Sequence, residues 1–184
     1  MTKTADRRAV LASRIADHLL DAGLGASSLR TIAAAVGTSD RMLLHYFPDK
    51  GALMAAALGE VARRMAVALE EVAIERMPFA PLVTVTWEVV KMPRFKPYMR
   101  LWLEVAAAAA RGDVTYRRIA GAIASGFIAW GAGRLDGADD SERQRLATLL
   151  LATIDGLVLL DAVGLGDAAD GAVAGGVAVA HISS

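Results

Sequence analysis

The chain has 184 residues, of which 55% are apolar, and its 20 basic and 20 acidic residues balance. This length suffices for a small domain plus a larger helical bundle, and the apolar content excludes a disordered chain. The absence of cysteine excludes disulfides and thiolate metal sites and agrees with a cytoplasmic location.

The N-terminal residues and the charge distribution give little information about function. Residues 1–20 mix charged and apolar positions, so no signal peptide is expected, and no apolar run reaches the ~20 residues of a membrane span. Residues 1–50 hold seven Lys or Arg against five Asp or Glu, a net of +2, which leaves −2 for the rest. Ordinary surface charge explains this asymmetry as well as DNA binding does.

Residues 5–22 predict an amphipathic helix. Leu11, Ile15 and Leu19 recur at helical spacing, while most charged side chains fall on the opposite face. Gly23 and Gly25 are expected to end it.

Residues 28–50, SLRTIAAAVGTSDRMLLHYFPDK, predict two short helices joined by a glycine turn. Ser28 and Ser39 are suited to cap the two helices, and Gly37 is expected to turn the chain with a positive φ. The expected buried positions are Ile32, Ala33, Val36, Leu43 and Phe47. This is the pattern of a helix-turn-helix, which places its second helix in the DNA major groove.

The stretch from Ser28 to Lys50, with Leu53 following, resembles the DNA-binding signature of TetR-family transcriptional regulators. The family pattern is a Ser or Thr cap, an Ile-Ala pair, a Gly turn, a Ser cap and an aromatic pair before a Lys. The matching residues are Ser28, Ile32, Ala33, Gly37, Ser39, Tyr46, Phe47 and Lys50. The resemblance covers about the first third of the chain, and the rest matches only in length and helical rhythm.

Three positions of the expected recognition helix depart from that pattern. Asp40 replaces a common Lys, Arg41 stands where a small residue is usual, and Leu44 replaces an aromatic residue. An acidic side chain near phosphates is repelled unless it pairs or accepts from a cytosine amino group, and Arg41 is its candidate partner. These departures concern base preference and leave the expected fold unchanged.

The resemblance implies particular roles for residues of this chain. Arg41 would read a base, through guanine if bidentate, and Met42 would touch a thymine methyl group. His45 has two interpretations, a phosphate contact or local capping and packing. The expected DNA-binding residues are Ser28, Arg30, Ser39, Arg41, Met42, His45, Tyr46 and Lys50.

The rest of the sequence also predicts helices, and no segment shows the two-residue periodicity that is typical of a strand. A linking helix is expected over residues 49–76, with Pro78 and Pro81 as a break. Further helices are expected at 82–91, 98–111, 115–135 and 141–163, and a last Ala/Gly-rich one ends near His181. The predicted fold is all-α with about nine helices: a three-helix DNA-binding domain over 1–50, and an effector-binding and dimerisation domain over 51–184.

Residues 146–160 carry too many large apolar side chains for one helix stripe. A helix that is apolar nearly all round must be buried on more than one side, and a second subunit is the simplest cover. The resembled family dimerises through its last two long helices, which implies a homodimer through residues 141–181. An ordinary intrachain core is the alternative.

Aromatic residues are scarce, at 5%, but they cluster among alanines and glycines. Such a cluster either fills the core or lines an apolar pocket for a small-molecule effector. Asp155, inside a very apolar helix, must pair, meet a ligand or face a partner. The candidate ligand-binding residues are Trp87, Phe95, Tyr98, Met99, Trp102, Phe127, Trp130 and Asp155.

An enzyme is not predicted, and neither a metal nor a cofactor is expected. His18, His45 and His181 are far apart in sequence, and neither an HExxH motif nor a P-loop is present. The prediction is therefore a ligand-responsive, dimeric transcriptional regulator, foremost a repressor released from a palindromic DNA operator by a small apolar effector. The alternative is a small-molecule-binding helical protein with a vestigial DNA-binding head, which Asp40 favours.

Overall fold

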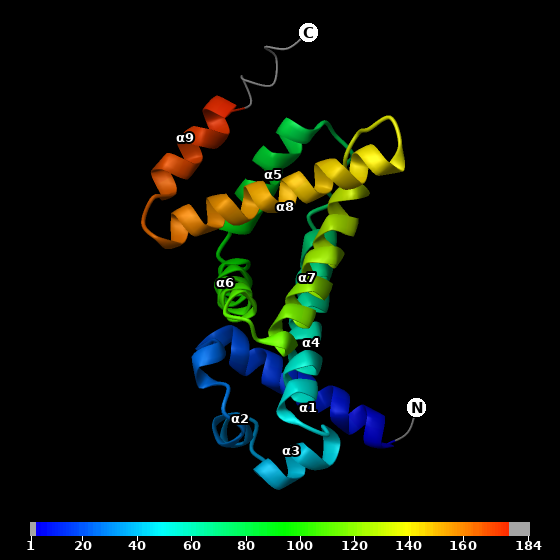
Figure 1. The fold of residues 1–184 in the computed structure, drawn as a ribbon, viewed down its shortest axis with the longest axis vertical. Coiled ribbons are helices and arrows are strands. Elements are labelled where there is room, and N and C mark those ends of the chain that lie inside the picture. Colours follow the sequence, from blue (N-terminus) through cyan, green and yellow to red (C-terminus); the bar gives the residue numbers. More distant parts are fainter. Residues whose placement is uncertain (1–2, 177–184) are drawn as a thin grey trace. The chain divides into compact units, whose positions relative to one another are not determined.

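The structure, a computed structural model, describes residues 3–176 as nine α-helices and one 3₁₀ helix, without a strand in that range (Figure 1). The elements are α1 (Lys3–Ala22), η1 (Leu24–Ala26), α2 (Leu29–Ala35), α3 (Asp40–Tyr46), α4 (Lys50–Glu70), α5 (Phe79–Lys91), α6 (Lys96–Ala110), α7 (Val114–Ala132), α8 (Asp140–Ala162) and α9 (Gly166–Gly176). The prediction of an all-α fold with about nine helices is confirmed.

The chain divides into two compact units. Among the described residues, unit 1 comprises 3–68 and 100–123, and unit 2 comprises 69–99 and 124–176. The division falls within α4, α6 and α7, so three helices continue from one unit into the other. The predicted domain boundary at residue 50 stays a prediction.

The core of unit 1 joins α1, α2 and α3 to the first turns of α4 (Figure 1). The predicted faces of α1 and of the two short helices are buried, because each short helix needs the apolar faces of its neighbours to be stable. The fully or almost fully buried side chains are Leu11, Ile15, Leu19, Ile32, Val36, Leu43, Phe47, Leu53, Met54 and Leu58.

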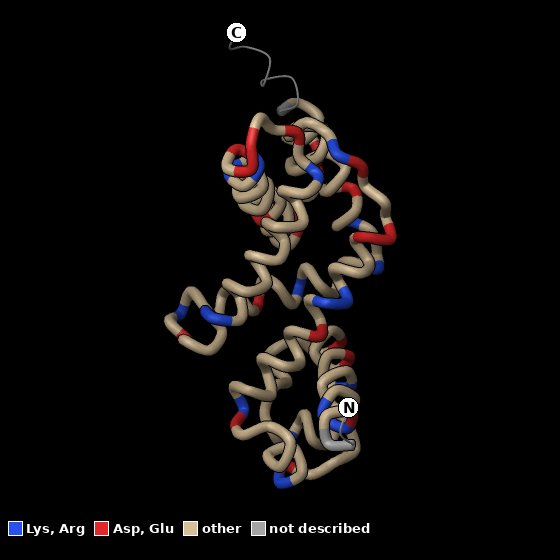
Figure 2. Tube along the Cα trace, turned by 90° about the vertical axis from the view of Figure 1, so that its right-hand side faces the viewer, with Lys and Arg blue, Asp and Glu red and all other residues tan. Residues whose placement is uncertain are grey.

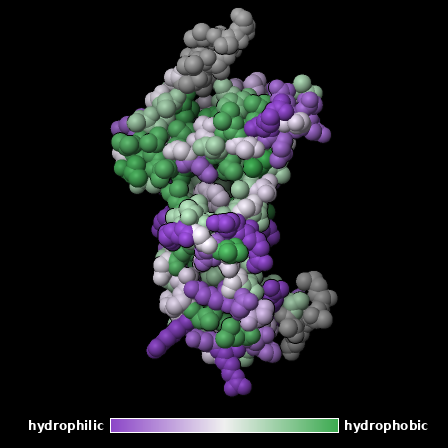
Figure 3. Space-filling model, in the orientation of Figure 1, coloured by the Kyte–Doolittle hydropathy of each residue, from purple (hydrophilic) through white to green (hydrophobic). Residues whose placement is uncertain are grey.

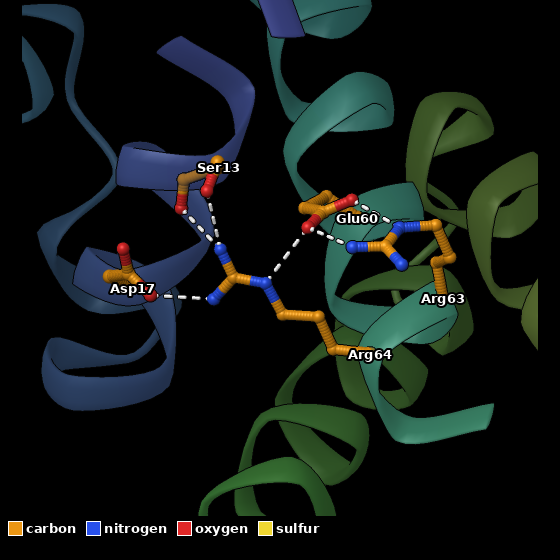
Figure 4. A network of polar contacts seen from close by, with 5 residues as sticks. All are labelled: Ser13, Asp17, Glu60, Arg63 and Arg64. Carbon is orange, nitrogen blue, oxygen red and sulfur yellow. Dashed lines mark hydrogen bonds and ion pairs between the residues drawn. The ribbon is translucent and has the colours of Figure 1, made fainter. Parts of the chain in front are cut away.

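Arg64 ties α4 to α1 through its two terminal guanidinium nitrogens, while its Nε binds within α4 (Figure 4). It donates to Asp17 Oδ1 at 2.5 Å and to the backbone and hydroxyl oxygens of Ser13 at 3.0 and 2.7 Å. Its Nε donates to Glu60 Oε1 at 2.9 Å. Hydrogen bonds from Arg63, and then from Arg64, lower the pKa of Glu60 from 4.5 to about 2 against the opposing effect of burial.

The first half of α6 holds the end of α1. Arg100 donates to the carbonyl oxygens of Leu20 and Asp21 at 2.6 and 2.8 Å, and Glu104 accepts from the Leu24 N–H at 2.6 Å. Gly23 between them has φ +73°, and a β-carbon there would lie 2.6 Å from Glu104 Oε1. Glycine is therefore favoured at this turn by its backbone conformation, and a side chain here would also displace the Glu104 carboxylate.

Unit 2 is built from α5, α8, α9 and the second half of α7. The Trp87 indole N–H of α5 donates to Asp170 of α9 at 2.7 Å, and Lys91 reaches the same carboxylate oxygen at 2.8 Å. A β-carbon at Gly131 of α7 would lie 3.2 Å from Leu150 of α8. Small residues therefore allow these helices to approach closely.

Several helix ends differ from the sequence prediction. The linking helix ends at Glu70 rather than at residue 76, because Ala73 adopts φ +54° and the chain then runs beside 134–136. The Met77 N–H donates to the Arg134 carbonyl at 2.9 Å, and the Asp136 N–H donates to the Met77 carbonyl at 3.0 Å. This pairing of distant segments has no signal in the local sequence.

Prolines 81 and 97 lie in the first turns of α5 and α6, where a missing N–H is tolerated, so these helices begin earlier than predicted. The cap of α8 is Asp139, which accepts from the Glu142 N–H at 2.7 Å, whereas the sequence predicts a start at Ser141. The predicted end of the last helix near His181 lies outside the described residues. No helix in the described part is long and apolar enough to span a membrane.

We predict that Glu60→Gln lowers the free energy of unfolding by about 1–2 kcal/mol near neutral pH, because it removes the charge that both arginines bind. Folding lowers the pKa of Glu60 to about 2, so its stabilising effect is complete above about pH 4.5 and is lost as pH falls through 2. Urea unfolding followed by circular dichroism at several pH values measures both effects.

The matched control is Glu71→Gln, which alters an exposed carboxylate whose contact with Arg94 is long, at 3.8 Å. Wild type should lose more stability than Glu60→Gln between about pH 5 and 2. If the free energy of unfolding depends on pH in the same way for wild type and for Glu60→Gln, the assigned role of Glu60 is contradicted.

Candidate nucleic-acid interface

The two short helices begin at the predicted serine caps. The Ser28 hydroxyl accepts from the Thr31 N–H at 3.0 Å, and the Ser39 hydroxyl accepts from the Met42 N–H at 3.2 Å. Both serines have extended backbone angles, as a capping residue requires. The caps satisfy N–H groups that the first turn of a helix leaves unpaired.

The turn between them depends on Gly37, whose φ is +66° as predicted. The Thr38 N–H donates to the Ala33 carbonyl at 2.9 Å, and the Gly37 N–H donates to the Ala34 carbonyl at 3.2 Å. This is the Schellman arrangement, in which a left-handed residue closes a helix end. It sets the direction in which α3 leaves α2.

Helix α3 has one buried and one exposed face. Leu43 and the following Phe47 are fully buried. Met42 and Leu44 are 45% and 44% exposed, and Arg41 and His45 are exposed as well. A seven-residue helix with two exposed large apolar side chains presents a surface that its own unit does not cover.

The predicted DNA-binding residues lie on α2, on α3 and at the start of α4. Tyr46 is half-buried, with its ring edge-on to that of His45 at 5.0 Å between centroids. The others are exposed: Ser28, Arg30, Ser39, Arg41, Met42, His45 and Lys50. The side chain of Asp40 forms no ion pair with Arg41, so the suggested partnership between these neighbours is absent from the structure.

The two folded units differ more in net charge than the two sequence segments on either side of residue 50 do. Unit 1 contains 13 Lys or Arg against 8 Asp or Glu, a net of +5, and unit 2 contains 7 against 12, a net of −5. The sequence division at residue 50 gives only +2, because unit 1 also includes residues 51–68, with a net charge of +1, and residues 100–123, with a net charge of +2. Figure 2 shows these charges along the trace. A basic unit that displays a capped short helix is suited to bind a polyanion.

The aromatic residues predicted to bind a ligand fall into separate groups. Phe127 and Trp130 contact each other with ring centroids 5.2 Å apart, and Phe95 and Tyr98 form a second pair at 6.5 Å. Trp87 is almost fully buried and donates to Asp170. Trp102 belongs to unit 1, whereas the other candidates, Met99 and the half-buried Asp155 included, belong to unit 2.

Three buried polar atoms of unit 2 have no hydrogen-bond partner: the Thr86 hydroxyl oxygen, the Trp130 indole nitrogen and Nε of Arg134. The sequence prediction did not include Thr86, which is one of two threonines in α5 and is fully buried, whereas Thr84 is half-buried. Within the described residues no group of three His, Cys, Asp or Glu side chains could hold a metal ion.

The comparisons with known proteins agree with this geometry. A family model described as "Bacterial regulatory proteins, tetR family" matches residues 16–57, which run from the second half of α1 through α2 and α3 into α4. No curated protein sequence matches the chain. Among solved structures, Salmonella enterica GusR is similar over 92% of this chain and 90% of that chain, with a TM-score of 0.62 and 21% identity. At this identity the structural likeness concerns the fold.

Proposed function

We propose that this chain, a DNA-binding regulator of the TetR family, is a dimeric repressor that a small apolar effector releases from a palindromic operator. The observation that carries the proposal is the exposed face of α3, which buried Leu43 and Phe47 hold in a fixed orientation. The net charge of +5 on unit 1 supports its attraction to DNA phosphates.

The residues divide between base and phosphate contacts. Arg41 would read a base edge, and Met42 would lie against a thymine methyl group. Ser28, Ser39, Tyr46 and Arg30 would hold phosphates, with His45 shared between roles. Lys50 would add a cation at the start of α4, where the helix dipole also favours an anion.

An exposed apolar face on α8 supports the proposed dimer. Leu149, Leu159 and Val163 are 52%, 53% and 63% exposed and lie on one side of the helix, with the exposed Gly156 between them. Figure 3 shows apolar surface over the region of α8 and α9. A β-carbon at Gly156 would meet no atom of its own chain. A second copy of α8 and α9 is the proposed cover, within the predicted interface 141–181.

The proposed effector site lies among the aromatic residues of unit 2. The unpartnered Thr86 hydroxyl and Trp130 indole N–H support an effector that adds a hydrogen-bonding group to a mainly apolar body, because buried polar atoms without partners are costly. Helix α4 would carry the signal, since it runs from Lys50 of unit 1 to Glu70 of unit 2. Effector and operator would then weaken each other's binding by the same factor.

A second candidate function is small-molecule binding by a protein whose DNA-binding surface is vestigial. Asp40 favours it, because this exposed carboxylate lies in the first turn of α3 without an ion pair to Arg41. Selection of bound sequences from random duplex DNA at several salt concentrations separates the two candidates. Enrichment of a palindrome with steep salt dependence supports the regulator, whereas no enrichment at low salt from ligand-free protein favours the alternative.

On the selected operator, Arg41→Ala is expected to cost about 1–3 kcal/mol per half-site and to relax preference at one base position. Lys50→Ala should weaken binding to all sequences and reduce the salt slope by about 1 per protomer. Fluorescence anisotropy with operator and scrambled duplexes measures both.

The matched control is Arg76→Ala, an exposed arginine of unit 2. If Arg41→Ala and Lys50→Ala both bind the operator with wild-type affinity, as the control should, the assigned DNA contacts are contradicted.

Gly156→Leu is expected to convert the dimer to monomer, because the open space at this position in one chain would be filled by the partner. Analytical ultracentrifugation measures the shift. Gly121→Leu, at another exposed helical glycine whose β-carbon would meet no atom, controls for the substitution itself. A Gly156→Leu protein that sediments as a dimer would refute this interface.

We expect the purified protein to retain its effector. If it retains none, small apolar compounds are expected to release it from the operator. Mass spectrometry of the denatured protein identifies a retained compound, and anisotropy of labelled operator follows release. A compound that binds equally well with and without operator would fail as the effector, because the coupling must be reciprocal.

A further inference from the structure

The corner between α6 and α7, residues 111–118 with the sequence RGDVTYRR, is a fixed part of unit 1. Gly112 turns the chain at φ +93°. One carboxylate oxygen of Asp113 accepts from the N–H groups of Thr115 and Tyr116 at 2.9 and 3.1 Å, which caps α7. Tyr116 is half-buried, and burial raises the pKa of its phenol. The corner is therefore held by local hydrogen bonds and by packing.

This corner lies against the first turn of α4. A β-carbon at Gly51 would be 3.4 Å from Thr115 Cγ2 and 3.5 Å from Thr115 Oγ1. Gly51 directly follows Lys50, which is the proposed phosphate contact at the start of α4. Residues more than 60 positions apart in sequence are thus adjacent within one compact unit.

The corner, whose Thr115 lies against Gly51, carries three exposed arginines: Arg111, Arg117 and Arg118. None of the three forms an ion pair within the described residues of unit 1. The neighbouring acids, Asp113 and Asp49, each accept from backbone N–H groups as caps of α7 and α4. Val114 is 76% exposed, so this apolar side chain at the start of α7 is as open as the arginines around it.

We propose that the α6–α7 corner is a second DNA-backbone contact, in which Arg117 and Arg118 bind operator phosphates next to the phosphate held by Lys50. The inference rests on the proposed function and extends the DNA-binding surface beyond the helix-turn-helix. Charge complementarity and continuity with the Lys50 end of α4 both favour duplex DNA as the occupant. Arginine suits this role because its planar fork binds two phosphate oxygens. The contact carries no sequence information, so it adds affinity without altering base preference.

The test compares wild type with the double variant Arg117→Gln/Arg118→Gln on the selected operator. Because this variant removes two phosphate-binding arginines from each protomer, the slope of log affinity against log salt should fall by about 4 per dimer. Affinity at ~0.1 M salt should fall roughly tenfold or more, while the selected sequence stays the same. Hydroxyl-radical footprinting should show weaker protection of the backbone flanking each half-site.

The control double variant, Arg76→Gln/Arg94→Gln, makes the same change of charge in unit 2 and should leave slope and footprint unchanged. Thermal unfolding verifies that both proteins fold. An unaltered slope and footprint in Arg117→Gln/Arg118→Gln, alongside weaker binding by Lys50→Ala, would overturn the corner contact and leave the regulator intact. Wild-type protein that binds no duplex DNA would refute both proposals.

Discussion

The burial of Leu43 and Phe47 is the constraint on which the proposed DNA-binding surface depends. Helix α3 has only seven residues, and isolated helices of that length are unstable in water. Two fully buried side chains on one face, with a serine cap at the start, hold it on the rest of unit 1. Their burial forces Arg41, Met42 and His45 to the opposite side. The proposed DNA-reading surface is therefore a consequence of packing on the inner face.

A second layer of polar contacts fixes the longer helices to that core. Arg64 binds Asp17 and Ser13 of α1 from α4, while Arg100 and Glu104 bind the end of α1 and the start of η1 from α6. Since α4 and α6 both continue into unit 2, each of these contacts joins α1 to a helix that belongs to both units. A conformational signal along either helix would reach α1 through a few charged hydrogen bonds.

The fold also concentrates charge. In sequence order the basic residues are spread from Lys3 to Arg145, and the chain is neutral as a whole. Folding brings residues 100–123, with a net charge of +2, into unit 1, so that unit 1 carries +5 and unit 2 carries −5. An electrostatic field depends on distances in space, so sequence segments alone underestimate how basic unit 1 is.

The sequence by itself determined the features that act over a few residues. Ser28, Gly37 and Ser39 were identified because caps and turns form between residues two to five positions apart, and the periodicity of Leu11, Ile15 and Leu19 revealed a buried face directly. Tertiary structure alone decided that α4 ends at Glu70, because the following segment pairs with residues 134–136. It also decided that Arg64 meets Asp17 and that Thr115 lies beside Gly51. Such contacts join residues some 50 to 65 positions apart, and their partners are chosen by how whole helices pack rather than by any local pattern.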